Sequence, residues 1–227
     1  MCGRFTNNAG PEQVEKEFKI GRLNPELFRP RFNIAPMQKI PAVLESSGGR
    51  VVEALRWGLI PGWAKDDSIG SKLINARAET LAEKPSFRNA FRSRRCIIPA
   101  TGFYEWQKKG AGAKQPFYFH LKDKEVFGFA GLYEEWTDKE TGEQIDTCTI
   151  ITTEANEVLR PVHERMPVIL KAEHYDRWLD KNEKDTEKLQ EFLAPYPAEE
   201  MTSYPVSRSV NIPDVDSEEL IKPLNSL

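Results

Sequence analysis

The chain has 227 residues, enough for one large domain or two small ones and for a substantial buried core. Its net charge of -3 excludes a global electrostatic pull toward nucleic acid, so any phosphate binding must come from a local patch. Three cysteines leave one unpaired in any pairing, and no run approaches the roughly twenty apolar residues of a membrane span. With three histidines and no ligand-spaced cluster, we expect a soluble cytoplasmic protein without a metal or cofactor.

The first predicted elements are a short helix and a β-hairpin. Residues 11–18 predict an amphipathic helix, because Val14 and Phe18 lie about one turn apart. Residues 41–44 and 51–57 predict two strands, and the Ser-Ser-Gly-Gly run between them predicts the turn of a hairpin.

The rest of the chain predicts more strands than helices. Ser86 can cap a helix that runs to Arg94. Four runs rich in β-branched and aromatic residues predict strands, at 96–98, 117–121, 126–132 and 145–152. Two later helices are expected at 172–179 and 186–193. With no repeat and no break in composition, this pattern predicts one α+β domain over residues 1–227, a barrel-like, mostly antiparallel β-sheet core with several short helices.

Cysteine at position 2 follows the initiator methionine directly, and its small side chain is of the kind that methionine aminopeptidases usually leave as the new N-terminus. Loss of Met1 would make Cys2 a free 1,2-aminothiol, with ordinary pKa values of about 7.7 to 8.0 for the amine and about 8.5 for the thiol. With an aldehyde, the amine forms a Schiff base and the sulfur closes onto the same carbon, giving a thiazolidine. The alternative is that Met1 stays and Cys2 packs as a small buried apolar group.

Six segments form an ordered set of motifs along almost the whole chain. They are MCGRF at 1–5, RFNIAP at 31–36, RWGLIP at 56–61, INARAET at 74–80, GFYEW at 102–106 and HERMPVIL at 163–170. Together they closely resemble the signature motifs of the SOS-response-associated peptidase family, SRAP. The resemblance implies a single SRAP domain of the DNA damage response that recognises abasic sites in single-stranded DNA. It also implies a protective covalent thiazolidine crosslink between Cys2 and the ring-opened sugar, with the peptidase role explained as removal of the residue ahead of Cys2. An accompanying AP lyase activity stays open.

The resemblance and the residue chemistry together predict four catalytic residues, namely Cys2, Asn75, Glu105 and His163. Glu105 lies in an apolar, aromatic run, where desolvation would raise the pKa of its carboxyl so that it can both give and take a proton. The alternative for Glu105 is an edge-strand carboxylate paired with an arginine. His163 is the second expected proton carrier, placed near the imine by the resemblance. The Asn75 amide would bind the sugar hydroxyl or the thiazolidine, unless it is a loop residue that bonds its own backbone.

The predicted DNA-binding residues are Arg4, Trp63, Arg77 and Arg88. Arg77 offers a planar guanidinium for phosphate, and a cation at Arg4 would both bind phosphate and favour the Cys2 thiolate. The alternative for either is a solvated surface arginine. Arg88 belongs to a basic group expected around the site, together with Arg92, Arg94 and Arg95. Trp63 is expected to stack on bases in preference to Trp57, because aromatic residues in strands usually belong to the core.

Two other functions remain open at this stage. An N-terminal-nucleophile amidohydrolase would also begin Met-Cys-Gly and would attack an amide with the Cys2 thiolate. A noncatalytic binder of single-stranded DNA would have a buried Cys2 and would give affinity without a covalent product. For all of these functions, nothing in the sequence requires more than a monomer.

Overall fold

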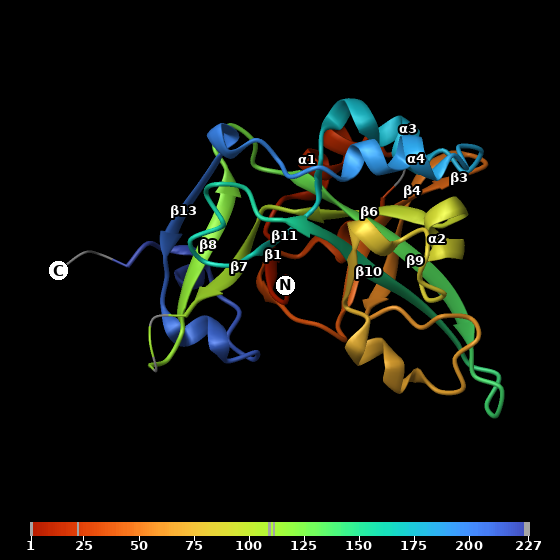
Figure 1. Ribbon diagram of the computed structural model, residues 1–227, viewed down its shortest axis with the longest axis horizontal. Coiled ribbons are helices and arrows are strands. Elements are labelled where there is room, and N and C mark those ends of the chain that lie inside the picture. The colour runs from red at the N-terminus through yellow and green to blue at the C-terminus, as the bar shows by residue number, and fades with distance from the viewer. Residues whose placement is uncertain (1, 22, 109, 111, 225–227) are drawn as a thin grey trace.

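A closed barrel and a smaller sheet form the protein, as the computed structural model in Figure 1 shows for residues 2–21, 23–108, 110 and 112–224. The barrel strands are β3 (Lys39–Ser46), β4 (Gly49–Trp57), β6 (Arg95–Ala100), β9 (Phe127–Thr137) and β10 (Gln144–Glu154). They follow the order β10-β4-β3-β6-β9, and the ring closes because β9 also pairs with β10. Only the β10–β4 contact among these five is parallel. The predicted α+β, barrel-like fold is therefore confirmed.

The smaller sheet and the short strands complete the β-structure. The small sheet has the order β13 (Met201–Pro205), β8 (Gln115–Leu121), β7 (Gly102–Gln107), β1 (Phe5–Asn7) and β2 (Arg31–Ile34). Next to the barrel, β5 (Asn75–Arg77) and β11 (Arg165–Pro167) pair with β10, and β12 (Ile169–Leu170) pairs with β9. The small sheet thus lies on one side of the N-terminus and the barrel on the other (Figure 1).

Short helices connect the strands and cover the outside of the barrel. The α-helices are α1 (Pro11–Phe18), α2 (Arg88–Ser93), α3 (Tyr175–Leu179) and α4 (Thr186–Gln190). The 3-10 helices are η1 (Pro25–Phe28), η2 (Asp67–Lys72), η3 (Ala78–Thr80), η4 (Ala172–His174), η5 (Glu191–Leu193), η6 (Ala198–Glu200), η7 (Arg208–Asn211) and η8 (Glu218–Ile221). In the part of the chain that the structure describes, no helix is both long enough and apolar enough to span a membrane.

The barrel has two apolar faces because side chains alternate along a strand. On the outer face of the barrel, Val43 and Ile97 pack with the buried residues of α1 to α4. The other face fills the barrel with residues such as Ile40 and Ile98. Phe5 of β1 enters this interior, and its ring packs edge-on against Trp57 at 5.3 Å.

Phe5 also contacts Phe129, with ring centroids 5.7 Å apart. Since β1 is hydrogen-bonded into the small sheet, Phe5 helps to hold the two sheets together, as does Phe103 of β7, whose ring lies 6.0 Å from that of Phe129. Cys2 lies three positions ahead of Phe5, at the junction of the two sheets.

Most predicted elements are confirmed, with differences at their ends. The helix at 11–18 and the hairpin match α1 and the pair β3–β4. The helix predicted from Ser86 begins only at Arg88, and its N-cap is Phe87, which makes no side-chain capping bond. The late helices at 172–179 and 186–193 each divide into a 3-10 turn and a short α-helix.

Candidate active site

The four predicted catalytic residues come together from four separate elements. Cys2 precedes β1, Asn75 begins β5, Glu105 lies on β7, and His163 lies two positions before the start of β11. The Asn75 Nδ2 donates to the Cys2 carbonyl oxygen at 2.8 Å, across 73 positions of sequence. Glu105 acts electrostatically on both the Cys2 thiol and His163. The site therefore lies where the barrel meets the small sheet.

The Cys2 side chain is fully buried and packs with the barrel interior. Burial, and after it the nearby Glu105 carboxyl, raises the pKa of the Cys2 thiol. The expectation that Arg4 favours the thiolate is therefore wrong. The sulfur lies 4.0 Å from the Arg4 backbone oxygen, whereas the Arg4 guanidinium donates to Asn33 and to the Val210 carbonyl. The predicted loss of Met1 falls outside the described residues.

Glu105 is 2% exposed on an inner strand, since β7 lies between β1 and β8. The alternative of an edge-strand carboxylate is therefore wrong. Burial raises the pKa of the Glu105 carboxyl, while the charge of His163 acts in the opposite direction. A carboxyl whose pKa is raised in this way can release and recover a proton nearer neutral pH.

His163 is held by the start of β11. Its Nδ1 accepts a hydrogen bond from the Arg165 backbone N–H at 3.0 Å, the shorter of its two contacts with Arg165. In the neutral ring this contact assigns the proton to Nε2. The Arg165 guanidinium in turn donates to both carboxylate oxygens of Glu79, at 2.6 and 3.0 Å, and to the Thr152 carbonyl. The ring is thus held through the backbone of β11, which pairs with β10 and is further anchored by the contacts of Arg165 with Glu79 and Thr152.

The predicted DNA-binding residues differ in their surroundings. Trp63 is 57% exposed, whereas Trp57 is buried and donates its indole N–H to the Ile74 carbonyl at 2.8 Å. The choice of Trp63 over Trp57 as the accessible ring agrees with the structure. Arg77 is exposed on β5, on the same face as Asn75 because the two are alternate residues of a strand. Arg88 is exposed on α2, which lies away from the N-terminus along the barrel (Figure 1).

The expectation of one basic group around the site is wrong for two of its arginines. Arg94 pairs with Glu134 on β9. Arg95 is buried and donates to the backbone carbonyls of Trp178 at 2.6 Å and Phe91 at 2.8 Å. Burial lowers the pKa of the Arg95 guanidinium to about 10. Arg95 therefore joins β6 to the outer helices and is not available for phosphate.

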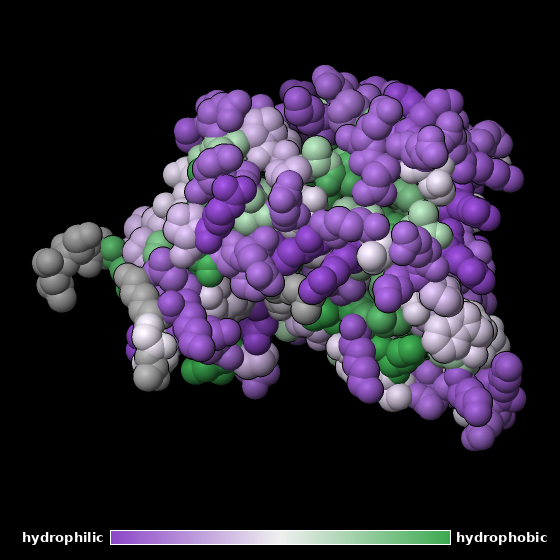
Figure 2. Space-filling view, viewed as in Figure 1, coloured by the Kyte–Doolittle hydropathy of each residue, from purple (hydrophilic) through white to green (hydrophobic). Residues whose placement is uncertain are grey.

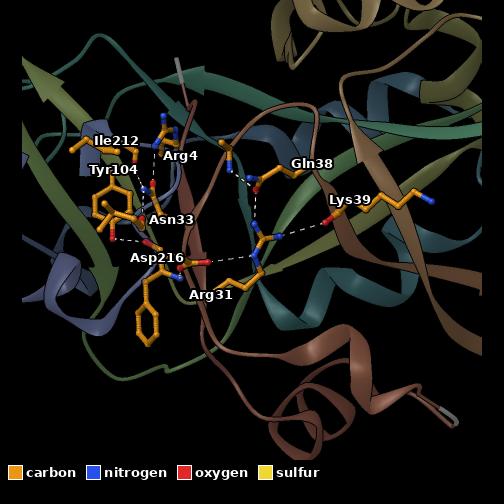
Figure 3. A network of polar contacts seen from close by, with 11 residues as sticks. Arg4, Arg31, Asn33, Gln38, Lys39, Tyr104, Ile212 and Asp216 are labelled. Carbon is orange, nitrogen blue, oxygen red and sulfur yellow. Dashed lines mark hydrogen bonds and ion pairs between the residues drawn. The ribbon is translucent and has the colours of Figure 1, made fainter. Parts of the chain in front are cut away.

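Sequence reasoning missed Asn33, the centre of the network in Figure 3. Its Oδ1 accepts from Arg4 Nη1 at 2.7 Å. Its Nδ2 donates to the carbonyls of Val210, Ile212 and Val215 at 3.3, 3.0 and 2.7 Å. Residues 206–224, called the C-terminal segment below, are held in this way against β2. Asn33 lies within the RFNIAP motif, but the motif alone does not indicate which segment its amide binds.

The molecular surface is hollowed between the two sheets. Figure 2 shows an indentation at the lower edge of the molecule, beside the position that Figure 1 marks as the N-terminus. Hydrophobic residues line its right flank in that view.

Comparison with known proteins places the chain in a family. The family model SRAP, SOS response associated peptidase, matches residues 1–213. The chain therefore belongs to the SRAP family.

Curated relatives match nearly the whole chain. The chain is 48% identical over 223 residues to abasic site processing protein YoqW of Bacillus subtilis (strain 168), covering 98% of this chain and 99% of that protein. It is 31% identical over 265 residues to abasic site processing protein HMCES of Gallus gallus, covering 99% of this chain and 78% of that protein. A crystal structure of a protein from Bacteroides thetaiotaomicron superposes with a TM-score of 0.87 at 29% identity, covering 98% and 100% of the two chains.

Proposed function

We propose that this protein recognises abasic sites in single-stranded DNA and captures them through Cys2 as a thiazolidine crosslink that protects the lesion. Membership of the SRAP family and the abasic-site relatives support the substrate. The observation that carries the mechanism is the contact of Asn75 with Cys2, with Glu105 and His163 beside them. The protein would act as a monomeric, single SRAP domain over residues 1–227, associated with DNA in the cytoplasm.

The reaction begins with the cyclic hemiacetal of the abasic sugar, which an acid and a base must open to the aldehyde. The Cys2 amine adds to the aldehyde carbon, and the resulting carbinolamine loses its hydroxyl as water after protonation by Glu105. Glu105 then takes back a proton from the thiol as the sulfur adds to the iminium carbon, and the ring nitrogen keeps a proton that came with the amine. One water leaves in total, and no oxidant or reductant is required.

The environment of each residue suits one of these steps. Because burial raises the pKa of the Cys2 thiol, the amine is the first nucleophile and the thiol needs a base to close the ring. Glu105, with its own pKa raised, supplies a proton for dehydration and takes one back from the thiol. The Asn75 Oδ1 is buried without a hydrogen-bond partner among the described residues, so it offers an acceptor to the sugar hydroxyl or the ring N–H.

The Cys2 amine can react only after the residue ahead of it has been removed. We include in the proposal a peptidase-type, autoproteolytic removal of Met1, which frees the amine. AP lyase activity would compete with capture, because an imine that the sulfur has not closed can undergo β-elimination. Arg77 and the exposed Trp63 ring would hold the flanking nucleotides. The amidohydrolase alternative needs a thiolate, and the raised pKa of the Cys2 thiol disfavours it.

The test mixes mature protein with a single-stranded oligonucleotide that carries one abasic site, followed by a denaturing gel. We expect a slowly migrating adduct with wild type and none with Cys2→Ala or with an uncleavable residue ahead of Cys2. An oligonucleotide without the lesion is the control. Unchanged adduct yield after chemical blocking of the amine would rule out the thiazolidine.

A further inference from the structure

Strand β7 carries a second polar side chain on the same face as Glu105. Tyr104 and Trp106 point to the other face, where they pack with Val206, Val210 and Leu220 of the C-terminal segment. Because side chains alternate along a strand, Glu105 and Gln107 share the face that looks toward the barrel. Gln107 is partly buried there, two residues beyond Glu105.

The loop at 155–164 carries His163 and belongs to the barrel side of the site, because it joins β10 to β11. Hydrogen bonds within the loop hold it as one unit. The Leu159 carbonyl accepts from the backbone N–H groups of Val162 at 2.8 Å and His163 at 3.0 Å. The Ala155 N–H donates to the Glu164 carbonyl at 3.0 Å. A displacement of the loop therefore displaces the imidazole with it.

Gln107 joins this loop to β7. Its Nε2 donates to the Pro161 carbonyl at 3.0 Å, across 54 positions of sequence and two residues ahead of His163. A carbonyl can only accept, so this contact also fixes which end of the amide faces the loop. The bond spans the junction of the two sheets, from the strand of one proton carrier to the loop of the other.

We infer that Gln107 is a positioning residue that holds His163 at its working distance from Glu105. The inference rests on the proposed function, in which both groups move protons at the same carbon. Proton transfer requires heavy atoms within hydrogen-bond reach, and a displacement of about 1 Å can cost about 100-fold in rate. Loss of one hydrogen bond shifts the equilibrium between the docked and undocked positions of the loop at 155–164 by about two- to tenfold. We expect a loss of that size in the reaction rate.

The test replaces Gln107 with Met, which keeps the length of the side chain and removes its donor. The rates of adduct formation and reversal are measured for wild type, Gln107→Met, His163→Ala and the double variant. We expect Gln107→Met to slow at least one of the two rates by about two- to tenfold, and to add nothing once His163 is absent. In NMR spectra, the ring signals of His163 should move in Gln107→Met, while those of His120 and His174 stay.

Gln115→Met is the matched control. Gln115 lies directly opposite Gln107 on β8, but its Nε2 donates to the Val206 carbonyl at 2.9 Å, away from the site. The same chemical change there should leave both rates and the His163 signals unaltered. Melting temperatures are to be measured for every variant, to establish that each is folded.

Three results would overturn the role of Gln107. They are wild-type rates in Gln107→Met, losses that multiply in the double variant, and a His163→Ala variant with wild-type rates. If wild type itself forms no adduct, the proposed function fails, and the NMR shift alone then decides whether Gln107 positions the ring.

Discussion

Replacing Asn33 with Leu should destabilise the protein by about 3 kcal/mol. The side chains are similar in size, so the change removes hydrogen bonds with little change in packing. The Asn33 amide accepts from Arg4 and donates to three carbonyls of the C-terminal segment. At about 1 kcal/mol for each bond, and with two N–H protons serving three carbonyls, the loss corresponds to about three full bonds. That is a large part of the 5 to 15 kcal/mol typical of a domain.

Urea unfolding followed by fluorescence measures this loss, with the slope of the transition checked for constancy. The C-terminal segment should also become sensitive to protease at urea concentrations where the barrel is still folded, since its carbonyls lose their shared donor. Asn182→Leu is the control, because Asn182 is exposed, and we expect a change within about 0.5 kcal/mol. A loss below about 1 kcal/mol in Asn33→Leu would show that the network does not contribute to stability.

Three further substitutions separate the effects on chemistry, on DNA binding and on stability. Glu105→Gln should slow adduct formation by on the order of 100-fold in single-turnover gels with noncovalent affinity unchanged, and equal losses in both would exclude proton transfer by this carboxyl. Because burial raises the folded-state pKa of Glu105, its contribution to stability falls as pH rises from about 4.3 through that raised value. Melting temperatures should therefore favour the Gln variant more at pH 7 than at pH 4, and the opposite trend would contradict the burial argument. Trp63→Ala should weaken binding to single-stranded DNA about five- to hundredfold in fluorescence anisotropy without lowering the melting temperature, whereas Trp57→Ala should cost about 3 to 5 kcal/mol of stability. Wild-type affinity in Trp63→Ala would exclude stacking by this ring.

The sequence predicts those elements that are long enough for their apolar side chains to form a periodic pattern. The helix at 11–18 and the long barrel strands have enough residues to show a period, whereas β1, β2 and β5 have three or four and show none. The basic group expected around the site extends beyond the helix that carries Arg88 and Arg92, since α2 ends at Ser93. Arg95 is in fact the first residue of β6.

For the candidate site too, the sequence predicts some features and not others. Residue chemistry selects Cys2 as a candidate and correctly predicts the direction in which the pKa of Glu105 is displaced. The contact between Asn75 and Cys2 depends on the parallel pairing of β5 with β10, which no local pattern encodes. Closeness along the chain was also misleading for Arg4, since its side chain reaches across to β2 and not back to the sulfur.

The insertion of Phe5 into the barrel links completion of the hydrophobic core to maturation of the N-terminal nucleophile. Chain ends commonly fray, yet here the ring that completes the hydrophobic filling lies three positions from the proposed nucleophile. Because the proposed removal of Met1 is autoproteolytic, a nascent chain would keep Met1 and carry no free aminothiol until the site that removes it has assembled. Maturation of the protein into a trapping agent would thus be governed by closure of its own barrel, which would spare cellular carbonyl compounds from an unfinished copy.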